Sequence, residues 1–103
     1  MGGIIVQDDG SFSSVYFAGM LERAGYKVRK VQAVTAELAA EKPDLIIMYV
    51  DGEVIPGITQ LAILNRRNSY SEKLLREAGV HCIQNVNALN IVQIVEERLH
   101  IPK

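Results

Sequence analysis

DLIIMYVDGEVIPG, residues 44–57, joins an uninterrupted apolar run to a cluster of turn-forming residues. A strand that is covered on both faces of a parallel sheet lacks polar alternation, so residues 45–50 are predicted to form such a strand. Residues 52–60 contain two glycines and a proline, which leaves no room for a helix before the apolar run at residues 61–64. We therefore predict two strands joined without the crossover helix that parallel strands usually have.

Outside this stretch, apolar runs alternate with helical patterns. Further strands are predicted at residues 4–6, 28–31 and 81–83, and helices at residues 12–24, 35–42, 69–79 and 88–99. In the first helix, Gly25 is the predicted C-terminal cap. The predicted apolar stripe consists of Phe12, Val15, Tyr16, Gly19, Met20, Leu21 and Ala24. The order predicts an α/β fold with a doubly wound, parallel five-stranded sheet, in a single domain of residues 1–103.

The composition argues against several classes of ligand. Eleven basic and twelve acidic residues give a net charge of -1 without a basic stripe, so we expect no direct binding of nucleic acid. No apolar run approaches the roughly 20 residues of a membrane span, and no signal-peptide pattern is present, so we expect a cytoplasmic protein without membrane association. The single cysteine, Cys82, cannot form an intramolecular disulfide and is expected to be a buried strand residue rather than a nucleophile. No metal-ligand spacing or phosphate-binding loop is visible, so we expect no cofactor.

Three segments match a known pattern in their order and spacing. Residues 4–28 read IIVQDDGSFSSVYFAGMLERAGYKV, residues 41–52 read EKPDLIIMYVDG, and residues 76–80 read REAGV. They resemble the receiver domains of bacterial two-component response regulators. The resemblance implies the flavodoxin-like (CheY-like) fold, a role in bacterial signalling, and an acid pair after the first strand, here Asp8 and Asp9.

The residues that carry the chemistry of receiver domains are replaced in this chain. Counted from Pro43, Tyr49 holds the position of the phosphoacceptor aspartate. Asn65 corresponds to the hydroxyl residue that ends the fourth strand, and Asn85 begins the Asn-Val-Asn that replaces the Lys-Pro after the fifth strand. The resemblance therefore implies a degenerate receiver, or pseudo-receiver, which is not an enzyme and acts as a regulatory protein-interaction module.

The residues at these positions each have two interpretations. Asp8 and Asp9 would help to hold Mg²⁺ in a working receiver; alternatively they occupy a turn and favour the next helix through its dipole. Tyr49 either packs its ring at the strand end with the hydroxyl at the surface, or serves as a phosphorylation or stacking site. Its phenol, with an ordinary pKa of about 10, forms no acyl phosphate. Asp51 either lies in the turn before Gly52 or substitutes for the missing acceptor.

A small-ligand sensor is the alternative function. Ligands of open α/β sheets bind in the crevice at the carboxyl ends of the strands. The polar residues predicted to reach that crevice are Asp8, Asp9, Tyr49, Asp51 and Asn65. A bound nucleotide or metabolite would raise the thermal stability, whereas a module that binds only proteins would give no such shift.

The last helix suggests a surface for a protein partner or a homodimer. On a helical wheel, four apolar residues can cover the sheet: Leu89, Val92, Val95 and Leu99. Ile91 and Ile94 widen the apolar arc beyond this contact. Because monomers rarely leave contiguous apolar patches exposed, these two isoleucines are predicted to contact a partner or a second copy. The alternative is that the missing crossover helix lets the last helix shift and bury both of them.

Overall fold

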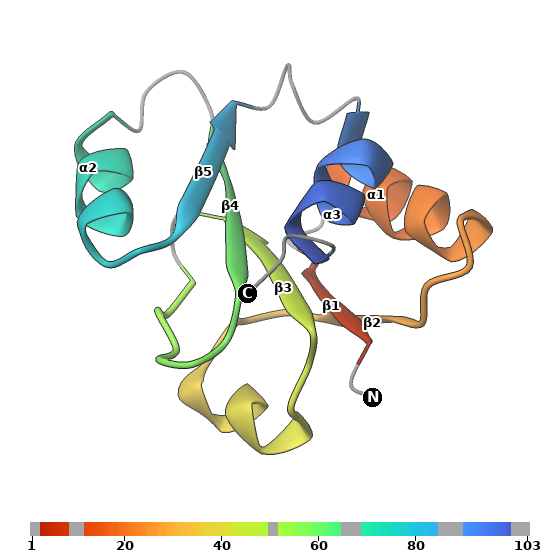
Figure 1. Cartoon of the computed structure of the whole chain (residues 1–103), viewed down its shortest axis with the longest axis horizontal. Helices are drawn as coiled ribbons and strands as arrows, with labels where there is room; N and C mark the ends of the chain where they lie inside the picture. Colours follow the sequence, from red (N-terminus) through yellow and green to blue (C-terminus); the bar gives the residue numbers. More distant parts are fainter. Residues whose placement is uncertain (1–2, 9–11, 50–51, 65–68, 85–89, 100–103) are drawn as a thin grey trace.

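The computed structural model describes residues 3–8, 12–49, 52–64, 69–84 and 90–99 (Figure 1). In chain order, the elements are β1 Ile4–Gln7, α1 Phe12–Arg23, β2 Val28–Val31, the 3₁₀ helix η1 Ala36–Glu41, β3 Leu45–Tyr49, β4 Gln60–Leu64, α2 Ser69–Glu77, β5 His81–Gln84 and α3 Ile91–Leu99. The strands form one five-stranded sheet in the order β2-β1-β3-β4-β5, and every neighbouring pair is parallel. The predicted doubly wound parallel sheet is confirmed, and the strand order is that of flavodoxin-like folds.

Alternation along the strands divides their side chains between the two faces of the sheet. In β1, Ile4 and Val6 point to one face and Ile5 to the other. The first-face core consists of Ile4, Val6, Phe17, Leu21, Leu45, Ile47, Leu61, Ile63, Ile83, Ile91 and Val95. Helices α1 and α3 contribute to this core and lie side by side over it (Figure 1).

The opposite face is covered by η1, α2 and the segment that precedes β4. The second-face core consists of Ile5, Val34, Leu38, Ile46, Met48, Ile55, Ala62, Leu64, Leu75, Val80 and Cys82. Residues 52–59 contain bends and a turn but no helix, as predicted for this connection. Ile55 in this segment is only 3% exposed, so it supplies apolar cover that a crossover helix would otherwise provide.

The four predicted helices are present, with bounds that differ from the prediction by one to three residues. The helix predicted at residues 35–42 is the 3₁₀ helix η1, which ends at Glu41 and is followed by Lys42, whose φ of 51° is left-handed. Pro43 explains this end, because a residue before proline is disfavoured in the right-handed helical region. The last helix, α3, begins at Ile91 rather than near residue 88, and residues 85–89 lie outside the described part of the chain.

Helix α1 turns only part of the predicted stripe to the sheet. Leu21 is buried and Met20 packs against the first-face core, as predicted, but Phe17 is buried while Val15 and Tyr16 are 54% and 46% exposed. The prediction that Val15 and Tyr16 belong to the core-facing stripe is wrong. Residues 15–18 are all apolar, so their spacing alone does not select one helical face.

Candidate functional site

The structure describes two of the residues predicted at the carboxyl edge of the sheet. Asp8 follows β1 and Tyr49 ends β3, and these two strands are neighbours. Four other predicted site residues lie outside the described residues: Asp9, Asp51, Asn65 and Asn85. The fold therefore brings the positions of Asp8 and Tyr49 to one edge of the sheet.

A buried glutamine links the two strands at this edge. Gln7 is 3% exposed, and its Oε1 accepts the backbone N–H of Tyr49 at 2.9 Å. The backbone register between β1 and β3 extends only to the pair Val6 and Ile47. Gln7 thus supplies a side-chain acceptor where the pairing of the two backbones ends.

Asp8 is half-buried, and its backbone N–H donates to the carbonyl of Val31 on β2 at 2.6 Å. Divalent cations such as Mg²⁺ need several oxygen ligands in a defined arrangement. Within the described ranges, no group of three His, Cys, Asp or Glu residues could hold a metal ion. The described residues therefore do not by themselves form the Mg²⁺ site that the acid pair implies.

Tyr49 packs against the protein interior. Its side chain is half-buried against the first-face core, and its hydroxyl oxygen is buried. This packing agrees with the first interpretation of Tyr49, although we expected the hydroxyl to lie at the surface. A buried phenol oxygen is poorly placed for a kinase or for a stacking ligand.

The proposed contact surface on α3 is not supported at Ile91. This side chain is 0% exposed and belongs to the first-face core, and Ile94 is half-buried against the same core. The prediction that both isoleucines form an exposed patch is wrong. The alternative interpretation fits better, because α3 is oriented so that Ile91 and Val95, one turn apart, face the sheet.

A cavity of about 420 Å³ lies at the opposite, amino edge of the sheet. We call it the amino-edge cavity; its walls are residues 54–60 before β4, residues 78–81 around the start of β5, and Arg98 of α3. Ile55 and Val80 give it a buried apolar wall. The cavity is thus built from three segments that are far apart in the sequence.

Gln60 holds one wall of the amino-edge cavity in place. It is 5% exposed; its Oε1 accepts the backbone N–H of Ile55 at 2.7 Å, and its Nε2 donates to the carbonyl of Glu53 at 2.7 Å. The same Nε2 lies 3.2 Å from Met48 Sδ. The side-chain amide of one buried glutamine therefore provides hydrogen-bond partners for two backbone groups, the N–H of Ile55 and the carbonyl of Glu53, in the segment that replaces the crossover helix.

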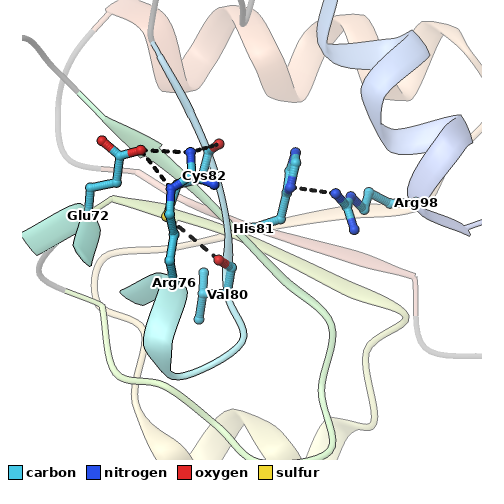
Figure 2. Close-up of polar contacts among 6 residues, drawn as sticks. All are labelled: Glu72, Arg76, Val80, His81, Cys82 and Arg98. Carbon is cyan, nitrogen blue, oxygen red and sulfur yellow. Dashed lines mark hydrogen bonds and ion pairs between the residues drawn. The ribbon is translucent and has the colours of Figure 1, made fainter. Parts of the chain in front are cut away.

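His81 and Arg98 meet on another wall of the amino-edge cavity. Figure 2 shows the Arg98 guanidinium reaching from α3 to the His81 ring, and it donates to His81 Nδ1. Burial lowers the pKa of His81 below its usual range, and the positive charges of Arg98 and Arg76 lower it further. The imidazole is therefore held neutral, with its proton on Nε2 when Nδ1 accepts.

Cys82, the next residue on β5, points into the second-face core. It is 4% exposed, and its Sγ donates to the carbonyl of Val80 at 3.7 Å. Burial raises the pKa of the thiol; Arg76 opposes this shift and Glu72 adds to it. As Figure 2 shows, Glu72 pairs with Arg76, whose Nη2 donates to the Cys82 carbonyl at 3.4 Å. This thiol is a core residue rather than a nucleophile.

Comparison with other proteins adds no family assignment. The chain matches no protein-family model, and no curated protein is significantly similar to it. Among the described helices, none is both long enough and apolar enough to cross a membrane. Interpretation of the site thus depends on the geometry of the chain itself.

Three residues of these sites were not predicted from the sequence: Gln7, Gln60 and Arg98. The two glutamines adjoin apolar runs, and a polar residue next to a buried strand is a weak signal of a buried hydrogen bond. Arg98 carries no such signal, because its contact with His81 depends on how α3 crosses the sheet.

Proposed function

We propose that this chain is an atypical receiver-like domain of bacterial two-component signalling, which acts without phosphorylation as a regulatory protein-interaction module in the cytoplasm. The observation that carries the proposal is the environment of Tyr49. It ends β3 at the position of the phosphoacceptor aspartate, and its side chain packs into the first-face core. A position that packs the core is no longer available for reversible chemistry.

The fold supports this proposal as well. Receiver domains have a parallel sheet in the order seen here, with the acceptor and the acid pair on neighbouring strands. In this chain β1 and β3 are also adjacent, and the backbone N–H of Tyr49 donates to Gln7 Oε1 at 2.9 Å. The proposal therefore retains the receiver scaffold and assigns its function to binding a protein partner or a second copy, rather than nucleic acid.

Exposure to small phosphodonors tests the absence of a phosphorylation switch. We expect acetyl phosphate with Mg²⁺ to leave the intact mass unchanged, because a phenol does not form an acyl phosphate. Beryllofluoride with Mg²⁺ should leave the amide NMR spectrum unchanged. A receiver domain that keeps its aspartate serves as the positive control for both reagents.

The variants Tyr49→Phe and Asp51→Asn identify the group if an adduct does form. Tyr49→Phe keeps the ring in the core and removes only the hydroxyl, so it should behave as the wild type does. A single phosphoryl adduct that is lost in Asp51→Asn would contradict the proposal and identify Asp51 as the acceptor.

A further inference from the structure

The amino-edge cavity combines a volume suited to a ligand with an uncompensated positive charge. Its volume of about 420 Å³ lies within the range of small-molecule sites, roughly 300–1,000 Å³. The described residues that line it include Arg98 and His81 but no aspartate or glutamate. Cationic and apolar walls, with no carboxylate among the described lining residues, are complementary to an organic anion.

Arg98 has hydrogen-bonding capacity left for such an anion. Of the described ion pairs, one joins Arg29 to Glu41 and the other joins Arg76 to Glu72. No described carboxylate lies within salt-bridge distance of Arg98, whose recorded contact is with a neutral imidazole. A guanidinium has five N–H donors in a planar fork that fits carboxylate and phosphate groups, so most of its donors remain for a ligand.

His81 adds a second donor next to the guanidinium. With Nδ1 accepting from Arg98, a neutral ring carries its proton on Nε2. The charged groups that act on this ring are Arg98 from α3 and Arg76 from α2, both positive. An anion in the cavity would oppose both positive charges and so raise the pKa of His81 toward its ordinary value.

We propose that the amino-edge cavity binds a small organic oxyanion, with Arg98 and His81 holding its charged group and Val54 and Ile58 contacting its apolar part. This site lies at the edge of the sheet opposite to Asp8 and Tyr49. It is therefore independent of the proposed interaction function, and an experiment that contradicts one of the two proposals leaves the other standing.

Two anions with the same ring test the proposal and distinguish the two oxyanion chemistries. Benzoate and phenyl phosphate are titrated into the uniformly labelled chain at constant ionic strength, and benzamide serves as the neutral analogue of benzoate. We expect saturable amide shifts at Ile58, Thr59, Gly79 and His81 with at least one anion. Benzamide should bind about tenfold more weakly, because it lacks the charge-assisted hydrogen bonds.

Matched arginine variants test whether the positive charge of Arg98 binds the anion. Arg98→Gln should weaken anion binding by about tenfold or more, whereas Arg23→Gln, which removes an exposed positive charge at the end of α1, should leave it unchanged. Circular dichroism verifies that both variants are folded. If Arg98→Gln does not fold, the pKa of His81 in the wild-type chain replaces it as the readout.

That second readout is a carbon-13 titration of the His81 ring with and without phenyl phosphate or benzoate. A bound anion should raise the pKa of His81. The proposal is overturned if neither anion saturates, if benzamide binds as tightly as benzoate, or if the two arginine variants bind equally well. An unchanged pKa of His81 at saturating anion also overturns it.

Discussion

His81 is held neutral by its surroundings, and this has a consequence for stability. Burial and the charges of Arg98 and Arg76 lower its folded-state pKa, whereas the unfolded chain titrates at about 6.5. Above that unfolded pKa, neither state binds the proton. As the pH falls below it, the unfolded state binds the proton first, so the folded state loses stability until its own lower pKa is reached.

We therefore predict that His81→Gln makes the stability less dependent on pH. Urea unfolding of the wild type and the variant, measured from about pH 5 to pH 7.5, gives the slope for each protein. Because all other titratable groups are common to both, the difference between the slopes isolates His81. Equal slopes would show that His81 has an unshifted pKa.

The sequence predicts the surroundings of some individual side chains and not of others. Cys82 was predicted as a buried strand residue, and its exposure of 4% confirms this. The prediction was possible because both faces of the sheet are covered, so a small apolar side chain within a strand is buried on either face. Gln60 was not predicted, because a glutamine bonds to whichever backbone groups the fold leaves unpaired. Arg98 was not predicted, because its partner lies on β5, which is separated from α3 in the sequence.

The segment before β4, residues 52–59, helps to cover the second face of the sheet although it contains no helix. The segment places Ile55 in the second-face core, and two hydrogen bonds of 2.7 Å between its backbone and the Gln60 side chain hold it in position. Gly52 contributes to the same arrangement: a Cβ at this position would lie 2.6 Å from Met48 Sδ. The absence of the helix was predictable from glycine and proline, but the contacts that replace it were not.

We predict that Gln60→Leu destabilises the chain although leucine is apolar and similar in size. The variant leaves the N–H of Ile55 and the carbonyl of Glu53 without their partner, at a cost of about 1–3 kcal/mol for each buried group. Gln93→Leu, at an exposed position of α3, is the matched control and should change the free energy of unfolding little. If both variants unfold at the same urea concentration, the hydrogen bonds of Gln60 do not support this segment.

Helix α3 shows how small a rotation separates a core face from a surface face. Ile91 was predicted to be exposed but is fully buried, and Ile94 lies at the margin. Apolar residues occupy five of the nine positions of α3, so the wheel permits more than one orientation. Contacts with α1 and the sheet decide between these orientations, and they are not visible in the sequence of α3 alone.

We predict unequal costs for truncating these two isoleucines. Ile91→Ala should destabilise the chain by about 2–5 kcal/mol, the range for a fully buried isoleucine, while Ile94→Ala should cost clearly less. Chemical unfolding followed by circular dichroism measures both. A larger loss for Ile94→Ala would mean that α3 is rotated relative to the orientation described above.

For the whole molecule, the two edges of the sheet have different features. The carboxyl edge has Asp8 and the packed Tyr49, while the amino edge has the amino-edge cavity. The parallel sheet and its two-sided core followed from apolar runs and their alternation with helices, whereas the flavodoxin-like strand order was implied by the resemblance to receiver domains. The cavity did not follow from either, because it needs two connecting segments and the end of a helix to meet in space.

The short connection between β3 and β4 also affects the order in which the chain folds. Residues 50–59 join these two strands, whereas residues 8–27 join β1 to β2 and residues 65–80 join β4 to β5. Closing a shorter loop costs less chain entropy, so pairing of β3 with β4 is the least expensive long-range step.

We therefore predict that the central pair forms the folding nucleus. Ile63→Val in β4 should slow folding, with a φ-value well above that of Ile83→Val in β5, although both side chains belong to the first-face core. Stopped-flow folding and unfolding rates give both values. The short segment that stands in place of the crossover helix is thus also predicted to make β3 and β4 the place where folding begins.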